Sequence, residues 1–408
     1  MKVAIVSVGT LPIPAVDGGA VETLIDNLIS ENEKKNFLDI DVYSIYSEKA
    51  EKKSKVYANT NYNYIKTNKF IQLLDSSIYA VIGKIFKKYT MSYRYIVQRI
   101  VYSWKIRKYI NENYDVVLFE ASQFLSIALL GNIVDRKTSI IFHAHNQLKK
   151  GFFLEKMLRK SDGILSVSNF IQNYLIRSYP TIENEKFFTL RNQVDTTVFQ
   201  PNKNEKAIIQ LKKQYGIKDN DTILVFLGRI SREKGVIEVC EALEKLNNPN
   251  VKLMIIGAAF FNSNIKDQYK LEIRDRFKKL EDSIIFTGYV DHELVPQYLK
   301  LADIAVCPAL WDEPAALTNM EILSCGIPLI TTNGGGTPEY VDEKSTVLLN
   351  RDDNLVNNIV SEINKMMMNE SYYNSLKRGA MGFYKTVSID RYYQDFVDIL
   401  KKLIVKEG

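Results

Sequence analysis

Short apolar runs alternate along the first half of the chain with segments whose apolar positions recur at helical spacing. The first run is followed by a predicted helix over about Ala20–Ser30, and another helix is predicted from Asn169 onward. Such alternation is typical of a parallel sheet covered by helices on both faces. The predicted strands of this half are Lys2–Val8, Asp39–Ser44, Asp115–Phe119, Ser139–Phe142, Gly163–Val167 and Phe187–Leu190.

The alternation begins again after the polar stretch QPNKNEK, residues 200–206, which we interpret as a linker. We therefore expect an α/β protein of two doubly wound, Rossmann-like domains, over 1–200 and 206–385, with ligand in a cleft where their strand ends face each other. A last amphipathic helix, within 386–408, could pack back on the N-terminal domain. The predicted strands of the second half, which also has a predicted helix over Gly235–Leu246, are Thr222–Leu227, Val251–Ile256, Ser283–Phe286, Ile304–Cys307 and Pro328–Ile330.

Length and composition agree with this organisation. The 408 residues exceed the usual size of a single hydrophobic core. The sequence contains no run of eighteen apolar residues that would predict a membrane span. Its N-terminus, MKVAIVSVG, predicts a first strand instead of a signal peptide. The three cysteines lack metal-ligand spacing and lie in apolar segments, so we expect buried thiols in a cytoplasmic protein.

The net charge of +6 is concentrated in one segment. Between Tyr64 and Ile110 there are ten basic residues and one acidic residue, Asp75, so this basic segment carries +9. Aromatic and aliphatic residues lie between the basic ones at helical spacing, which favours a helix on an anionic membrane surface. The apolar face could equally pack on the domain. No nucleic-acid-binding motif accompanies the charge, so we expect no nucleic-acid partner.

Two cations follow the first predicted strand of the second half. In GRISREKG, residues 228–235, Arg229 and Lys234 lie five residues apart at the strand's carboxyl end. Arginine can bind phosphate oxygens in a bidentate fashion and lysine binds them as a point charge, so the pair could hold one diphosphate. A charged surface loop is the alternative interpretation.

The stretch Cys307–Val341 holds two carboxylates, Glu313 and Glu321, with seven residues between them. We predict a helix that begins near Ala315, which leaves the backbone N–H groups of Ala316, Leu317 and Thr318 free. Helix N-termini attract phosphate, and carboxylates accept hydrogen bonds from vicinal hydroxyls, so these groups suit a sugar joined to a phosphate. On spacing alone, a solvated acidic pair on an ordinary helix is the alternative.

Metal ligands are not expected. His143 and His145 lie two apart at a strand end and point to the same side, but the sequence nominates no third ligand for a metal site beside them. Two D-x-D stretches, Asp39–Asp41 and Asp219–Asp221, each lead into a strand, away from the expected cleft. The sequence therefore predicts neither a metal nor another cofactor.

Several segments resemble family 4 retaining glycosyltransferases of the GT-B fold. The resemblance covers most of the chain and is strongest between Arg191 and Val341, whereas the basic segment matches no motif. The segments that carry it are VDGGAVE, SVSNF, RNQVDTTVFQP, GRISREKG, FTGYVDHELVPQYLKLADIAVCPALWDEP and MEILSCGIPLITTNGGGTPEYV with its E-x7-E pair.

The resemblance implies a role for each matching residue. Arg229 and Lys234 would bind the donor's phosphates, Glu321 would hold the nucleotide ribose, and Glu313 would lie close to the donor sugar. Gly18 and Gly19 would approach the diphosphate and the donor sugar, and His145 would contact the sugar at the reacting centre. Tyr289 would lie near the base and Glu339 near the sugar.

The sequence departs from the family where a glycine–phenylalanine–glycine loop usually follows the first glutamate. Here Pro314, Ala315 and Ala316 stand instead, so the identity of the donor does not carry over.

We therefore expect a cytoplasmic, metal-independent retaining hexosyltransferase that works at the inner face of the cell membrane. It would move a hexose-type sugar from a nucleotide-diphosphate sugar to an acceptor hydroxyl, on a lipid-linked saccharide of capsule, exopolysaccharide or lipopolysaccharide assembly. The alternatives are a non-catalytic GT-B partner subunit and a nucleotide-sugar hydrolase or phosphorylase on the same fold. A dinucleotide-dependent oxidoreductase is disfavoured, because no G-x-G-x-x-G turn follows the first strand.

Overall fold

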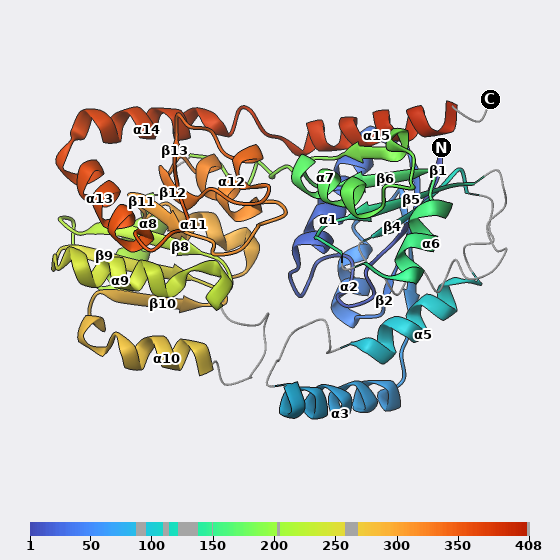
Figure 1. The fold of residues 1–408 in the computed structure, drawn as a ribbon, viewed down its shortest axis with the longest axis horizontal. Coiled ribbons are helices and arrows are strands. Elements are labelled where there is room, and N and C mark those ends of the chain that lie inside the picture. The colour runs from blue at the N-terminus through green and yellow to red at the C-terminus, as the bar shows by residue number, and fades with distance from the viewer. Residues whose placement is uncertain are drawn as a thin grey trace. The chain divides into compact units, whose positions relative to one another are not determined.

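The computed structural model describes residues 1–86, 95–108, 114–120, 138–148, 150–201, 205–257 and 268–405. They form two compact units (Figure 1). The N-terminal unit comprises Met1–Arg191 together with Asp390–Gly408, and the C-terminal unit comprises Asn192–Ile389. The two units are therefore divided after Arg191 and after Ile389. The positions predicted from the sequence were 200 and 385.

The N-terminal unit is built on a parallel sheet. Among the described residues it has seven strands in the order β3-β2-β1-β4-β5-β6-β7. Strands β1 and β4, at the centre of the sheet, are apolar and almost wholly buried, as expected when helices cover both faces. The strands are β1 (Lys2–Val6), β2 (Asp39–Ile45), β3 (Thr60–Ile65), β4 (Val116–Glu120), β5 (Ser139–Ala144), β6 (Gly163–Ser166) and β7 (Phe187–Thr189).

The C-terminal helix α15 (Ile389–Val405) belongs to this unit and packs on it. The Tyr393 hydroxyl donates to Asn32 Oδ1 over 2.7 Å. Gly163 leaves room for Leu403, because a Cβ at this glycine would collide with the leucine side chain. The other helices of the unit are α1 (Ala20–Lys35), α2 (Glu48–Ser54), α3 (Lys69–Phe86), α5 (Ile96–Ile106), α6 (Phe152–Lys160) and α7 (Asn169–Ser178).

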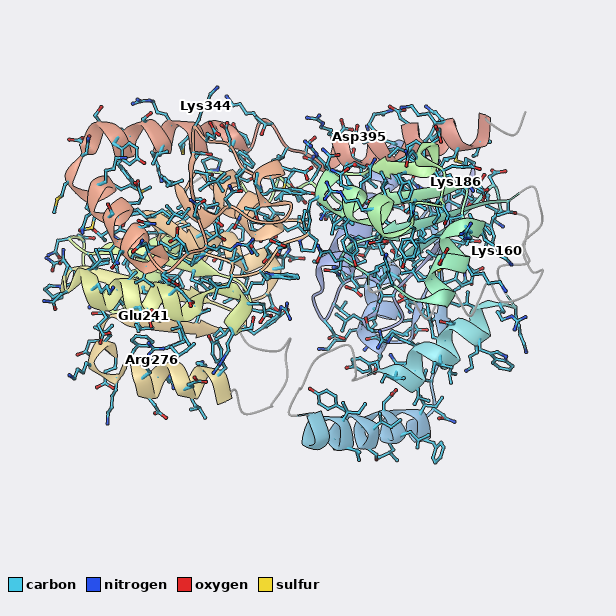
Figure 2. The ribbon with its side chains drawn as sticks, viewed as in Figure 1. Lys160, Lys186, Glu241, Arg276, Lys344 and Asp395 are labelled. Atoms are coloured by element: carbon cyan, nitrogen blue, oxygen red, sulfur yellow. The ribbon has the colours of Figure 1, made fainter. Side chains whose placement is uncertain are left out.

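The C-terminal unit repeats the architecture with six described parallel strands in the order β10-β9-β8-β11-β12-β13. An ion pair between Glu241 and Arg276 links helices α9 and α10 (Figure 2). The strands are β8 (Thr222–Leu227), β9 (Val251–Ile256), β10 (Ile284–Gly288), β11 (Ile304–Cys307), β12 (Leu329–Thr332) and β13 (Thr346–Leu349). The helices are α8 (Glu205–Tyr215), α9 (Val236–Leu246), α10 (Gln268–Arg276), α11 (Val295–Leu299), α12 (Leu317–Ser324), α13 (Leu355–Met368) and α14 (Glu370–Phe383).

The two predicted Rossmann-like domains are confirmed, with two strands added. Strand β3 was not predicted, because its polar and aromatic sequence TNYNYI contains no apolar run, and neither was the short edge strand β13. The three cysteines are free and buried, as predicted, and burial raises the pKa of each thiol to about 12. Among the helices described here, none is long and apolar enough to cross a membrane.

The described part of the basic segment folds as α3 and α5, which lie side by side (Figure 1). Asp75 of α3 is buried and accepts hydrogen bonds from the backbone N–H groups of Val97 (2.8 Å) and Gln98 (2.9 Å). These are N–H groups of the first turn of α5, which have no partner within the helix. The one acidic side chain of the segment is thus used to join its two helices.

Candidate active site

A tight turn after β8 is fixed against the loop that follows β11. Lys234 ends a short 3-10 turn, Arg232–Lys234, and Gly235 follows it with φ of 75°. A Cβ at Gly235 would collide with the carbonyl oxygen of Pro308, so glycine alone fits there. Leu310 N–H also donates to the Glu233 carbonyl over 2.8 Å. These contacts bring the turn and the loop together at the carboxyl end of the sheet.

The same loop is fixed on its other side by the glycine turn after β12. Gly335 has φ of 60°, and a Cβ there would collide with the backbone of Asp312 and Glu313. Gly336 N–H donates to the Glu313 carbonyl over 2.6 Å. Arg351 Nη2 lies 2.6 Å from Asp312 Oδ1. The backbone of Glu313 is therefore set by its neighbours on both sides.

The two turns place Lys234 in contact with Glu313. Their side chains form an ion pair, and the indole Nε1 of Trp311 donates to the same carboxylate oxygen of Glu313 over 2.8 Å. The Lys234 ammonium also lies 5.6 Å from the centroid of the Trp311 ring, within cation–π range. Both charged side chains are largely buried, at 20% and 11% exposed. The structure thus brings together one predicted phosphate ligand and one predicted sugar ligand.

Arg229 is not part of this contact. Its Nη2 lies 3.6 Å from Glu233 Oε1, and both side chains are more than 40% exposed. An exposed pair of this kind contributes little stability, so the guanidinium can exchange partners readily.

Glu321 lies in the middle of α12, which begins at Leu317 with Ala316 as its N-cap. The helix therefore starts two residues later than predicted. Leu317 and Thr318 still supply N–H groups of its first turn, and Ala316 supplies that of the N-cap. Glu321 Oε1 lies 2.7 Å from Nε2 of His292, whose ring packs 5.0 Å from that of Phe199.

The pKa of His292 is shifted by two opposing effects. Burial lowers it, but the charge of Glu321 and the hydrogen bond to it outweigh burial and raise the pKa above its usual value. The pair should therefore stabilise the protein fully below the unfolded pKa of about 6.5, and this contribution should be lost as pH rises through the higher folded pKa. We expect the difference in melting temperature between wild type and His292→Gln to be larger at pH 5.5 than at pH 8.5. A difference that stays constant or grows with pH would contradict this sign.

Two weaker candidates of the C-terminal unit lie at its turns. Tyr289 directly follows β10 and is 37% exposed. Glu339 ends the short helical turn Thr337–Glu339, and its N–H donates to the carbonyl of Gly336. The N–H of Gly336 in turn donates to the carbonyl of Glu313. Neither placement assigns the residue a ligand.

The N-terminal unit contains the predicted glycine loop. Gly18 and Gly19 have φ of 77° and 106°, and Gly19 is the N-cap of α1. A Cβ on Gly19 would collide with the carboxylate of Glu22, in the first turn of that helix. Burial, with a smaller contribution from the charges of Glu120 and Asp26, raises the pKa of Glu22 to about 7.

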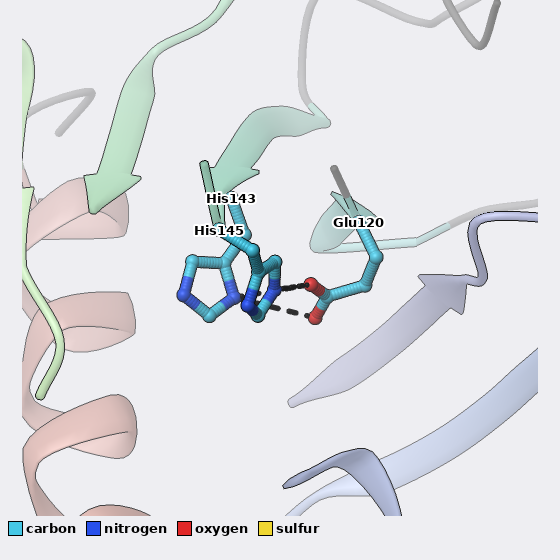
Figure 3. Close-up of side chains that lie close together, drawn as sticks. All are labelled: Glu120, His143 and His145. Atoms are coloured by element: carbon cyan, nitrogen blue, oxygen red, sulfur yellow. Dashed lines mark hydrogen bonds and ion pairs between the residues drawn. The ribbon is translucent and has the colours of Figure 1, made fainter. Parts of the chain in front are cut away.

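His145 lies beside a carboxylate that the sequence analysis did not single out (Figure 3). Nε2 of His145 lies 2.6 Å from Glu120 Oε2, and Nδ1 of His143 lies 3.1 Å from the same atom. All three residues are buried. Burial alone would raise the pKa of Glu120, but the charges and hydrogen bonds of the two histidines together lower it to about 2. Burial and the neighbouring His143 lower the pKa of His145.

Glu120 is a carboxylate of the kind that can bind a metal, and it lies beside the two histidines for which the sequence nominated no third ligand. Potential ligand atoms of Glu120, His143 and His145 lie within 4.8 Å of one another. Two ligands about 2.0–2.2 Å from one tetrahedral ion would lie roughly 3.4 Å apart, however. The 2.6 Å between His145 Nε2 and Glu120 Oε2 is instead a hydrogen-bond distance. The arrangement described here is therefore a hydrogen-bonded cluster.

The sequence and the structure are similar to those of known glycosyltransferases. Residues 207–382 match the family model described as glycosyl transferases group 1. A putative glycosyltransferase, YtcC of Bacillus subtilis, is 25% identical over 390 residues, which cover 93% of this chain and 86% of the relative. The structure of HepE from Anabaena, in complex with UDP and glucose, superposes with a TM-score of 0.73 and 16% identity over 98% of this chain and 99% of that one.

The chain has the GT-B fold. A second solved GT-B-like neighbour is WaaG, described as a glycosyltransferase involved in lipopolysaccharide biosynthesis, with a TM-score of 0.67 and 13% identity over 98% of this chain and 99% of that one. The family match lies within the C-terminal unit, which holds Lys234, Glu313 and Glu321. The GT-B fold, the family match and the named relative together support a glycosyltransferase.

Proposed function

We propose that this protein is a family 4 retaining glycosyltransferase that moves a hexose-type sugar from a nucleotide-diphosphate sugar to an acceptor hydroxyl. The acceptor in this proposal is a lipid-linked saccharide of capsule, exopolysaccharide or lipopolysaccharide assembly. The UDP and glucose bound by HepE support the class of donor, and the description of WaaG supports the class of acceptor.

The contact between Lys234 and Glu313 is the observation that carries the proposal. When the bond between sugar C1 and the diphosphate oxygen breaks, negative charge develops on the diphosphate and positive charge on the sugar. A fixed ammonium beside a fixed carboxylate offers one partner for each charge, and neither has to be reorganised during the reaction.

Neighbouring groups add to the stabilisation of the leaving group. Among the described residues, Arg229 forms an exposed pair with Glu233, from which its guanidinium can turn to the diphosphate. The first-turn N–H groups of α12 favour anionic oxygens. The acceptor oxygen then forms the new bond to C1 with retention of the anomeric configuration. Its proton passes to the departing diphosphate oxygen, and the nucleoside diphosphate is released.

In this proposal Lys234 and Arg229 supply the positive charge that a divalent ion supplies in metal-dependent transferases. The rate should therefore be unchanged in EDTA. A loss of turnover that Mg²⁺ or Mn²⁺ restores would contradict metal independence.

The function is tested by finding the donor and then the product. A thermal-shift screen of common nucleotide sugars should give one compound that raises the melting temperature most, since a ligand that binds the native state stabilises it. With that donor and a saccharide acceptor, NMR should show a glycoside of unchanged anomeric configuration. Turnover with water or phosphate as sole acceptor would favour a hydrolase or phosphorylase, and binding without any turnover would favour a non-catalytic partner subunit.

Membrane contact is proposed from the exposed faces of α3 and α5. On α3, Phe70, Leu73, Leu74 and Val81 are exposed, and they fall within about 100° of the helix circumference. On α5, Trp104 is also exposed, at 55%. A cationic segment with an exposed apolar face suits an anionic bilayer surface. Three lysines of the same segment, Lys84, Lys87 and Lys88, lie outside the described side chains.

We expect Phe70→Ser combined with Leu73→Ser to weaken binding to vesicles containing phosphatidylglycerol by more than tenfold. Burial of each side chain in the bilayer would contribute about 1.5–3 kcal/mol to the free energy of vesicle binding. Both side chains are more than 60% exposed in the protein, so their replacement should not change the melting temperature. Val56→Ser, at an exposed apolar position outside the two helices, is the matched control. Equal vesicle binding by wild type and the double variant in a flotation assay would remove the membrane proposal.

A further inference from the structure

Glu120 is a buried carboxylate at the end of β4 for which the proposed function has no role so far. Strand β4 lies between β1 and β5, and Glu120 is the register partner of His143. A buried carboxylate is costly unless it is hydrogen-bonded, so its partners indicate what it does. Among the described residues its hydrogen-bond partners are two histidine rings, one of which is the predicted sugar ligand His145.

The direction of the hydrogen bonds follows from the ionisation of Glu120. At neutral pH this carboxylate is charged, and a charged carboxylate can only accept hydrogen bonds. Each ring nitrogen that faces it must therefore carry a hydrogen. For His145 that nitrogen is Nε2, at 2.6 Å, and for His143 it is Nδ1, at 3.1 Å.

The second nitrogen of His145 then has a defined chemistry. A neutral imidazole carries one hydrogen, so with Nε2 protonated, Nδ1 has a free lone pair and accepts a hydrogen bond. A sugar hydroxyl is a donor that suits such a nitrogen. The ring of His145 also packs against that of His143, with 4.1 Å between the two ring centroids (Figure 3). Its contacts with Glu120 and His143 together fix its orientation.

We propose that Glu120 is a positioning residue that holds His145 as its Nε2–H tautomer, so that Nδ1 accepts a hydrogen bond from a hydroxyl of the sugar substrate. The inference rests on the proposed function for the identity of the substrate, but the tautomer itself is a property of the ligand-free protein. The two parts can therefore be tested separately.

Nitrogen NMR of the ring gives the first test. The chain has only three histidines, so single variants of His143 and His292 assign the His145 signals in a two-bond proton–nitrogen spectrum. At neutral pH we expect His145 of the wild type to be neutral with its hydrogen on Nε2. A hydrogen on Nδ1, or a doubly protonated ring, would overturn the proposal whether or not the protein is a transferase.

Kinetics give the second test. In Glu120→Gln one carboxylate oxygen is replaced by an NH₂ donor and the negative charge is lost. The side chain then no longer requires a hydrogen on Nε2, so His145 should become a mixture of tautomers. We expect kcat to fall by about 10–100-fold with the donor KM changed less than threefold, since the loss concerns a hydrogen bond that orients the reacting sugar. Glu120→Asp keeps the charge and should restore part of the rate. Glu48→Gln, an exposed carboxylate on α2, is the matched control.

A double-mutant cycle separates positioning from a general structural role. If Glu120 acts through His145, Glu120→Gln should lower kcat no further in a His145→Ala background. Additive losses would show that Glu120 acts independently and would overturn the proposal. A stoichiometric transition metal in the purified wild type that is absent from Glu120→Gln would do the same, because the cluster would then be a metal site.

Discussion

Replacing Lys234 by methionine is expected to lower kcat/KM for sugar transfer by about 10²–10³-fold. Methionine keeps an unbranched stem beside Trp311 but removes the charge that Glu313 holds in place. The leaving diphosphate then loses a preorganised cation at the moment when its negative charge develops. Steady-state rates with the donor found by thermal shift give the measurement, and a melting curve shows that the variant is folded.

Arg232→Met is the matched control for this effect. Arg232 belongs to the same short turn, but its guanidinium is largely exposed and pairs with Glu272 at 3.2 Å. Its loss should change kcat/KM less than threefold. Equal losses in the two variants would mean that positive charge near the turn matters in general and that Lys234 has no special position.

The second large effect is expected at Gly235, where alanine should lower the free energy of unfolding by about 2–4 kcal/mol. The backbone has φ of 75°, which alanine adopts only with strain, and the new Cβ would collide with the Pro308 carbonyl. Because that carbonyl belongs to the loop that carries Glu313, transfer should also slow by at least tenfold. Urea unfolding and steady-state rates measure the two effects.

Gly382→Ala separates this collision from the general consequence of losing a glycine. Gly382 lies in α14, and a Cβ there would meet nothing within 4 Å. Stability should stay the same or rise by at most about 1 kcal/mol, and the transfer rate should not change. If Gly235→Ala behaves like Gly382→Ala, the turn and the loop are not held together as described.

The fold could be predicted because its central strands are buried on both faces. Runs such as Thr222–Leu227 and Val251–Ile256 are apolar except for Thr222 and Lys252 and end at turn signals. Both were predicted with the bounds that the structure has. The edge strand Thr60–Ile65 was missed because a strand with one neighbour needs no apolar run. The start of α12 was two residues off because Ala315 and Ala316 are good helix formers, and only tertiary context ends the loop at Ala316.

The candidate site was only partly predictable for a different reason. Motif spacing nominates single residues, whereas the pairs that define their chemistry are distant in sequence. His292 and Glu321 are 29 residues apart, and Glu120 and His145 are 25 apart. Glu120 could have been found, since it directly follows the predicted strand Asp115–Phe119, and the next predicted strand leads into both histidines. Trp311 carried no such signal, because its contact with Glu313 depends on the shape of the loop.

We expect the Lys234–Glu313 end of the C-terminal sheet to bind a diphosphate through fixed positive charge. The decisive experiment is calorimetric titration of the nucleoside diphosphates into wild type and into a folded Arg229→Ala/Lys234→Ala double variant. We expect one diphosphate to bind the wild type, and the double variant to bind it at least tenfold more weakly and to have lost turnover. Equal affinity in the two proteins would contradict the account.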